Sequence, residues 1–207
     1  MLTSQTHDRG FSIILVIGAL STISLLMVAA LHLVQDHRRR SSLFADHALA
    51  LQEAEAALAV AECELALATD TPSLGDCTPA PSAARITALN PINLAGFVRG
   101  HCGQDTPRRG LCWPAEGLSA QALAGLAGTT SSNAVPLPRT TTVSPRQPMR
   151  NARYIIEPIP DTQVGQWVDA GTPPSPWLFR ITAVGFSADE HVNVLLQTVY
   201  RPRAIQP

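Results

Sequence analysis

The sequence predicts an α+β fold in which one long N-terminal helix packs on a small antiparallel sheet. Three observations predict this class. Residues 11–34 form an uncharged apolar run, residues 35–68 continue without Pro or Gly, and three β-rich segments follow residue 150. The chain has 207 residues, of which 45% are apolar, and its 17 prolines imply many loops between these elements.

Composition excludes several classes of function. The formal net charge of −1 argues against a nucleic-acid partner, because such partners need a clear excess of positive charge. All 15 basic residues are arginine. A Schiff base, a lysine general base and the lysine of a phosphate-binding loop are therefore excluded.

The apolar run over residues 11–34 is long enough to cross a membrane. It holds 24 residues without a formal charge, and 18 of them are Ala, Val, Ile, Leu, Met or Phe. As a helix it measures about 36 Å, against a hydrocarbon core of about 30 Å. We expect a transmembrane helix here.

A polar leader of ten residues ends abruptly at the boundary between Gly10 and Phe11. The apolar run that follows is longer than the 7–15 residues of an ordinary secretory signal. A polar leader, a glycine, a phenylalanine and a long apolar helix are typical of a prepilin signal, so this end of the chain resembles type IV pilins. The resemblance implies that a prepilin peptidase cleaves between Gly10 and Phe11 and methylates the new amine of Phe11.

Two features complicate this interpretation. Major pilins carry a glutamate at the fifth position of the mature chain, where this sequence has Leu15. The resemblance therefore implies a rare or tip-proximal subunit. Arg38–Arg40 follow the apolar run whereas only Arg9 lies close before it, a distribution that the positive-inside rule reads as a cytoplasmic C-terminal region. Because of the cysteines and the resemblance, we expect a bacterial inner-membrane protein with a periplasmic C-terminal domain, incorporated into the pilus tip after assembly.

Residues 35–68 are expected to continue the helix as an amphipathic stalk. Phe44, Leu51, Leu58 and Leu65 recur every seven residues, and Ala54, Ala61 and Ala68 complete an apolar stripe. We expect this stripe to pack against the chain's own globular region, residues 69–207. The acidic residues of the stalk, Asp46, Glu53, Glu55, Glu62 and Glu64, fall mostly at other angles.

Four cysteines, Cys63, Cys77, Cys102 and Cys112, lie beyond the apolar run. An even number in this position indicates disulfides formed in an oxidising compartment. Three pairings are possible, and we favour the sequential one, Cys63–Cys77 with Cys102–Cys112. The alternative is a zinc site that also uses His101, which the absence of C-x-x-C spacing disfavours.

The segment 128–150 is rich in Thr, Ser and Pro and is expected to be a variable surface loop. Before it, Ser119 is expected to cap a short helix over residues 120–126. After it, residues 153–157, 178–185 and 191–200 are β-rich, the first ending at Pro158. With a loop over residues 186–190, they predict an antiparallel meander of at least three strands.

These strands carry the second resemblance. The stretches RYIIE, FRITAVGF and VNVLLQTVY occur in the order of the closing strands of PilX-like minor pilins, and residues 50–58 and 110–112 resemble further stretches of that family. The resemblance implies a minor pilin, with a type IV pilin-like fold, that acts in initiation and assembly of type IV pili. Its implied partners are other minor and major pilins, the prepilin peptidase, the membrane and an adhesin-like protein at the pilus tip.

Two alternatives share parts of this architecture: a minor pseudopilin of a type II secretion system, and a periplasmic enzyme on a single-span anchor. The sequence contains no G-x-S-x-G, no H-E-x-x-H and no Gly-rich phosphate loop. The six histidines are scattered, and Asp189-Glu190-His191 is expected to form a polar turn. We therefore expect no enzymatic activity, no cofactor and no metal.

Overall fold

A computed structural model describes residues 9–69, 77–113, 126, 128, 133–138, 146–161 and 177–202, with side chains from residue 13 onward. The chain divides into two compact units, Met1–Ala45 and Asp46–Pro207. The first unit contributes the N-terminal part of the long helix. The second contains the rest of that helix, a short helix and the sheet.

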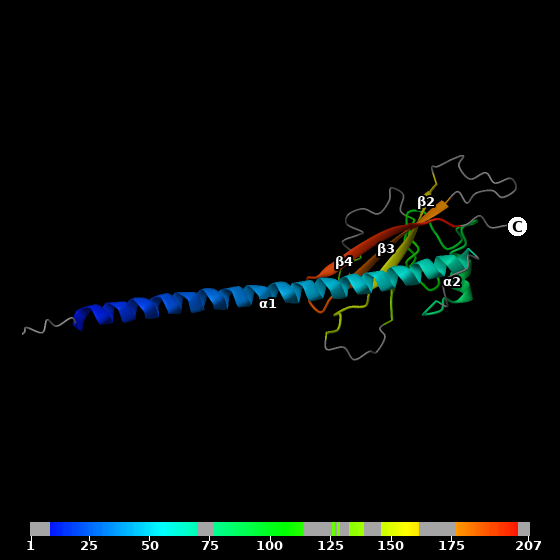
Figure 1. Cartoon of the computed structure of the whole chain (residues 1–207). Helices are drawn as coiled ribbons and strands as arrows, with labels where there is room; N and C mark the ends of the chain where they lie inside the picture. Colours follow the sequence, from blue (N-terminus) through cyan, green and yellow to red (C-terminus); the bar gives the residue numbers. More distant parts are fainter. Residues whose placement is uncertain are drawn as a thin grey trace, which may run out of the picture. The chain divides into compact units, whose positions relative to one another are not determined.

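Helix α1 runs unbroken from Arg9 to Ala68 (Figure 1). The predicted long helix is therefore confirmed, and it forms because no proline interrupts these residues. At its end the backbone N–H of Thr69 donates to the Leu65 carbonyl at 3.0 Å, and the Thr69 hydroxyl donates to the same oxygen at 2.8 Å. These bonds satisfy a carbonyl that the helix itself leaves open.

The sheet has four antiparallel strands in the order β1-β2-β3-β4. Their bounds are β1 Val135–Pro136, β2 Arg153–Pro160, β3 Trp177–Phe186 and β4 Asn193–Tyr200. The three predicted strands are confirmed, and the α+β pilin-like class with them. Strand β1 was not predicted, because it is only two residues long and lies within the Thr/Ser/Pro-rich segment.

Strand β2 does not end at Pro158 as expected but continues through Pro160. The reason is that the N–H and C=O groups of successive residues point alternately to the two sides of a strand. Ile156 donates its N–H to Gly110 and accepts from Cys112, so its polar groups point away from β3. Pro158 and Pro160 share this orientation, two and four residues further along the strand. Their missing N–H groups therefore remove no hydrogen bond from the β2–β3 ladder.

Helix α1 buries Ala54, Ala61 and Leu65 of the predicted apolar stripe, together with Ala50 and Ala57 beside them. Ala50, Ala54, Ala57 and Ala61 are fully buried, whereas Phe44 is 77% exposed. A strict seven-residue repeat drifts by about 20° per repeat around a straight helix. The seven-residue row therefore approaches the core toward its end, where Leu58 packs against the core and Leu65 is fully buried, and Phe44 lies off the packed face.

Small side chains allow β3 to approach α1 closely. A Cβ atom on Gly185 would overlap the carbonyl oxygen of Ala50 and the backbone nitrogen of Ala54. Glycine is therefore required where the strand contacts the helix backbone. The main core then spreads from Ala57, Ala61 and Leu65 to inward-facing residues of β2 and β3.

A short helix, α2 (Ala83–Ala88), is capped by Ser82, whose hydroxyl accepts from the Arg85 N–H at 3.2 Å. Parts of the expected loop 128–150 are structured: β1 lies in it, and Met149 donates its N–H to Ser187 at 2.8 Å. The predicted helix 120–126 lies outside the described residues except for Leu126, which is buried.

Candidate functional site

The first candidate site is the N-terminal half of α1, an apolar surface from Ile13 to Val34. Every side chain in this stretch is exposed, and its large apolar side chains are 49–71% exposed. By length and composition it is the one helix among the described residues able to cross a membrane. Such a surface is unfavourable in water, so it is compatible with membrane anchoring.

The three hydroxyl side chains of this stretch are hydrogen-bonded within the helix. The hydroxyls of Ser21, Thr22 and Ser24 each donate to a backbone carbonyl three or four residues earlier, all at 2.8 Å. A hydroxyl that is already bonded costs less to transfer into a low-dielectric environment. Between Ile13 and Val34 the helix therefore presents no unbonded hydroxyl where apolar neighbours would pack.

The predicted cleavage pair, Gly10 and Phe11, lies in the first turn of α1. The leader residues 1–8 and the side chains of residues 9–12 lie outside the described part of the chain. Cleavage and N-methylation at Phe11 therefore stay predictions. Leu15, which stands where major pilins carry a glutamate, is exposed on the apolar surface.

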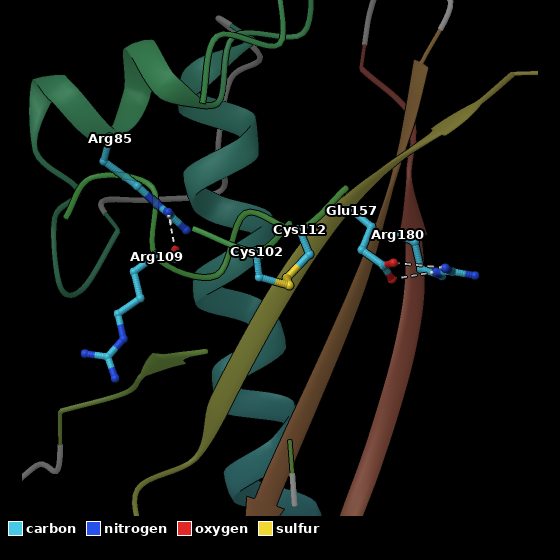
Figure 2. Close-up of a disulfide and its surroundings, with 6 residues drawn as sticks. All are labelled: Arg85, Cys102, Arg109, Cys112, Glu157 and Arg180. Atoms are coloured by element: carbon cyan, nitrogen blue, oxygen red, sulfur yellow. Dashed lines mark hydrogen bonds and ion pairs between the residues drawn. A yellow bond between two sulfur atoms is a disulfide. The ribbon is translucent and has the colours of Figure 1, made fainter. Parts of the chain in front are cut away.

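The second candidate site is a loop of the globular region closed by a disulfide between Cys102 and Cys112 (Figure 2). A second disulfide joins Cys63, near the end of α1, to Cys77. The structure thus contains the sequential pairing that we favour from the sequence. The alternative zinc site would need free thiolates, and in the structure all four sulfurs are bonded to each other in pairs. No group of three metal-binding side chains occurs among the described residues.

A buried arginine anchors the disulfide-closed loop. Arg85 of α2 donates through Nη1 to the carbonyls of Pro107 and Arg109, at 2.8 and 2.6 Å. Its Nε donates to Glu64 of α1 at 3.1 Å. Nη2 also lies 3.1 Å from the same carboxylate oxygen, an ion-pair contact without the alignment of a hydrogen bond. Arg85 thus connects α1, α2 and the loop; Figure 2 shows its head group directed at the Arg109 backbone.

Tyr154 of β2 lies beside this ion pair. Burial raises the pKa of its phenol far above the ordinary value, and the charge of Glu64 adds to the effect. The phenol is therefore neutral at physiological pH. It is an element of the packed core rather than a source of acid–base chemistry.

A second buried carboxylate, Glu157 of β2, receives two hydrogen bonds from Arg180 of β3, at 2.9 and 3.2 Å (Figure 2). Burial raises the pKa of Glu157, and the bonds from Arg180 act in the opposite direction. The two residues lie directly opposite each other on neighbouring strands, where the pair stabilises the sheet.

Sequence reasoning missed the buried charges of the stalk. Asp46 and Glu64 were expected away from the packed face, yet both are buried, Asp46 with Arg146 at 2.7 Å and Glu64 with Arg85. The angular positions of Asp46 and Glu64 around the helix did indicate burial. At about 100° per residue, Asp46 and Glu64 lie within a few tens of degrees of Ala50 and Ala57.

Among the described residues, Ser187, Asp189, Glu190 and His191 have the composition of a catalytic cluster, but they form a turn. Asp189 accepts from the backbone N–H of His191 at 2.9 Å, and Ser187 exchanges hydrogen bonds with the Asp189 backbone. Glu190 and His191 are exposed. These bonds close the β3–β4 connection, as expected for a polar turn.

Comparison with protein families yields one match. The family described as type IV pilus assembly protein PilX, C-terminal, matches residues 68–202, well over half of the chain. A comparison with curated proteins finds no match, and neither does a comparison with solved structures. The match covers the whole sheet, the segment closed by Cys102 and Cys112, and Cys77 of the other disulfide, whose partner Cys63 lies before the matched range. The family is a structural one, so its role lies in pilus assembly. The chain therefore belongs to the PilX family of type IV pilus assembly proteins.

Proposed function

We propose that this protein is a minor pilin that acts in the initiation and assembly of type IV pili and is not an enzyme. One combination of observations carries the proposal: the residues matched by the PilX family, 68–202, follow a helix segment whose apolar side chains are exposed. The proposed organisation is a leader over residues 1–10, a membrane span over 11–34, a stalk over 35–68 and a periplasmic region over 69–207, in which 128–150 is a variable loop.

In the proposed mechanism, the prepilin peptidase removes the leader and methylates Phe11. The span then leaves the lipid and packs against the corresponding helices of other minor and major pilins. Gly18, Ala19 and Ser21 give the helix small side chains, which permit close helix approach. In this mechanism the globular region takes part in no catalytic step.

The position of Leu15 favours a rare subunit. A carboxylate there could pair with a terminal ammonium inside a low-dielectric helix bundle, and leucine cannot form that pair. A subunit without the pair is better suited to the pilus tip than to repetition along the filament. An adhesin-like protein at the tip is the further partner that we propose.

Terminal sequencing of the mature protein, made in a host with the peptidase, tests the processing step. We expect the chain to begin at N-methyl-Phe11 and a Gly10→Glu variant to keep its leader. Gly18→Ala, away from the junction, is the matched control and should be processed normally. An unprocessed Met1 in the unchanged protein would contradict the proposal, and a start at Leu31 would indicate ordinary secretion.

Deletion of the gene separates a pilus role from a secretion role, which the N-terminal signal alone does not. We expect surface pili to be lost while type II secretion continues at its normal rate. Normal pili with blocked secretion would instead identify a pseudopilin. Complementation with the unchanged chain is the control.

A further inference from the structure

Three consecutive arginines follow the apolar surface of α1. Arg38, Arg39 and Arg40 are all exposed, and successive residues are about 100° apart around the helix, so their charges face more than half of its circumference. Arg40 pairs with Asp36 at 2.8 Å, one turn earlier. No described residue forms an ion pair with Arg38 or Arg39. The segment therefore carries an uncompensated positive charge next to the proposed span.

The spacing along the helix places these arginines at one lipid headgroup layer. At about 1.5 Å per residue, the helix rises about 40–44 Å from Phe11 to residues 38–40. A bilayer with its headgroups measures about 40–45 Å. If the amine of Phe11 lies among the phosphates of one leaflet, Arg38–Arg40 lie among the phosphates of the other.

We propose that Arg38, Arg39 and Arg40 form a headgroup-binding collar that holds the phosphates of anionic phospholipids in the leaflet where α1 leaves the membrane. This inference rests on the proposed function, because it needs residues 11–34 to span the bilayer. Guanidinium groups suit the task, since each can donate two parallel hydrogen bonds to one phosphate. By binding these phosphates, the collar sets how deep the span lies in the bilayer before the subunit joins the pilus.

The collar also accounts for a charge distribution that the positive-inside rule disfavours. Three arginines in a leaflet of neutral lipids would remain unneutralised, whereas anionic headgroups supply the opposite charge in place. Each arginine near an anionic surface strengthens binding by about five-fold. Arg38 and Arg39 together should therefore contribute about 25-fold.

The test uses the full leader-free chain in neutral detergent micelles, titrated with phosphatidylglycerol or with phosphatidylcholine of the same acyl chains. Native mass spectrometry counts the lipids bound. We expect tighter binding of phosphatidylglycerol, a loss of about 25-fold in Arg38→Gln/Arg39→Gln, and no change for phosphatidylcholine. The matched control Arg99→Gln/Arg108→Gln removes two exposed arginines from the globular region and should retain the preference.

Several outcomes overturn the collar. These are equal binding of the two lipids, an unchanged preference in Arg38→Gln/Arg39→Gln, an equal loss in the control, or displacement of the lipid by millimolar inorganic phosphate. Retained preference in Arg38→Lys/Arg39→Lys, at reduced strength, supports it, because lysine keeps the charge without the paired donors.

Carbonate extraction of cell membranes distinguishes a failure of the collar proposal from a failure of the proposed function. If the chain resists extraction but shows no lipid preference, only the collar is wrong. If carbonate releases the chain, the span and the collar both fail.

Discussion

The Nε atom of Arg85 lies 3.1 Å from Oε2 of Glu64, and both side chains are less than a tenth exposed. Each charge is removed from water, so each depends on the other for compensation. Arg85 also holds two backbone carbonyls of the loop between Cys102 and Cys112. The position of that loop relative to α1 therefore depends on one guanidinium.

Replacing this arginine should destabilise the globular region strongly. We expect Arg85→Met to lower the free energy of unfolding by about 3–5 kcal/mol, because Glu64 is left buried without its partner. Urea unfolding of the full chain in detergent, followed by tryptophan fluorescence, measures the change. Arg108→Met, an exposed arginine in the same loop, is the control and should cost less than about 0.5 kcal/mol. A cost below about 1 kcal/mol for Arg85→Met would show that the pair does not hold the loop.

Gly185→Ala should separate β3 from α1. The added methyl group would overlap backbone atoms of Ala50 and Ala54, which cannot rotate away as a flexible side chain can. We expect a loss of about 1–3 kcal/mol of unfolding free energy. Gly18→Ala is the matched control, since nothing lies within 4 Å of the added atom. Equal effects at the two glycines would argue against close backbone contact at Gly185.

The disulfide pairs can be read directly by peptide mapping without reduction. We expect linked peptides for Cys63 with Cys77 and for Cys102 with Cys112, and no other pairs. Because each bond closes a loop of 10–14 residues, losing one should cost about 3 kcal/mol in the chain-entropy model. Cys102→Ser/Cys112→Ser tests this cost, with the Cys63–Cys77 bond left intact. A crossed pair such as Cys63 with Cys102 would contradict the fold around Arg85.

The sequence predicted the long helix and the three main strands because each has a strong local signal. The helix has no proline between Arg9 and Ala68, and the strands are rich in β-branched and aromatic residues. The ends of the elements were less well predicted. Pro158 seemed to end β2, and only the direction of the Ile156 backbone groups shows why a proline is accepted there.

The buried ion pairs were not predicted for a different reason. Burial of Asp46 and Glu64 depends on arginines that are distant in sequence, Arg146 and Arg85, and no local pattern reports such a partner. The predicted stripe of the stalk was right for Ala54, Ala61 and Leu65 but wrong for Phe44, which is exposed. Gly10 and Phe11 could be identified only by resemblance, since their chemistry belongs to a peptidase and not to this fold.

Glu157 should make the stability of the globular region depend on pH. Burial raises its pKa in the folded state, so the folded protein holds this proton at pH values where the unfolded chain has released it. Glu157 therefore contributes its full stabilisation below the ordinary glutamate pKa of about 4.3. This stabilisation is lost as pH rises through the pKa that Glu157 has in the folded state. We expect urea unfolding at pH 4, 5, 6 and 7 to show this decline, and Glu157→Gln to reduce it. Glu190→Gln, an exposed carboxylate, should leave the decline as in the unchanged protein. A Glu157→Gln protein whose stability falls just as steeply with pH would refute the assignment.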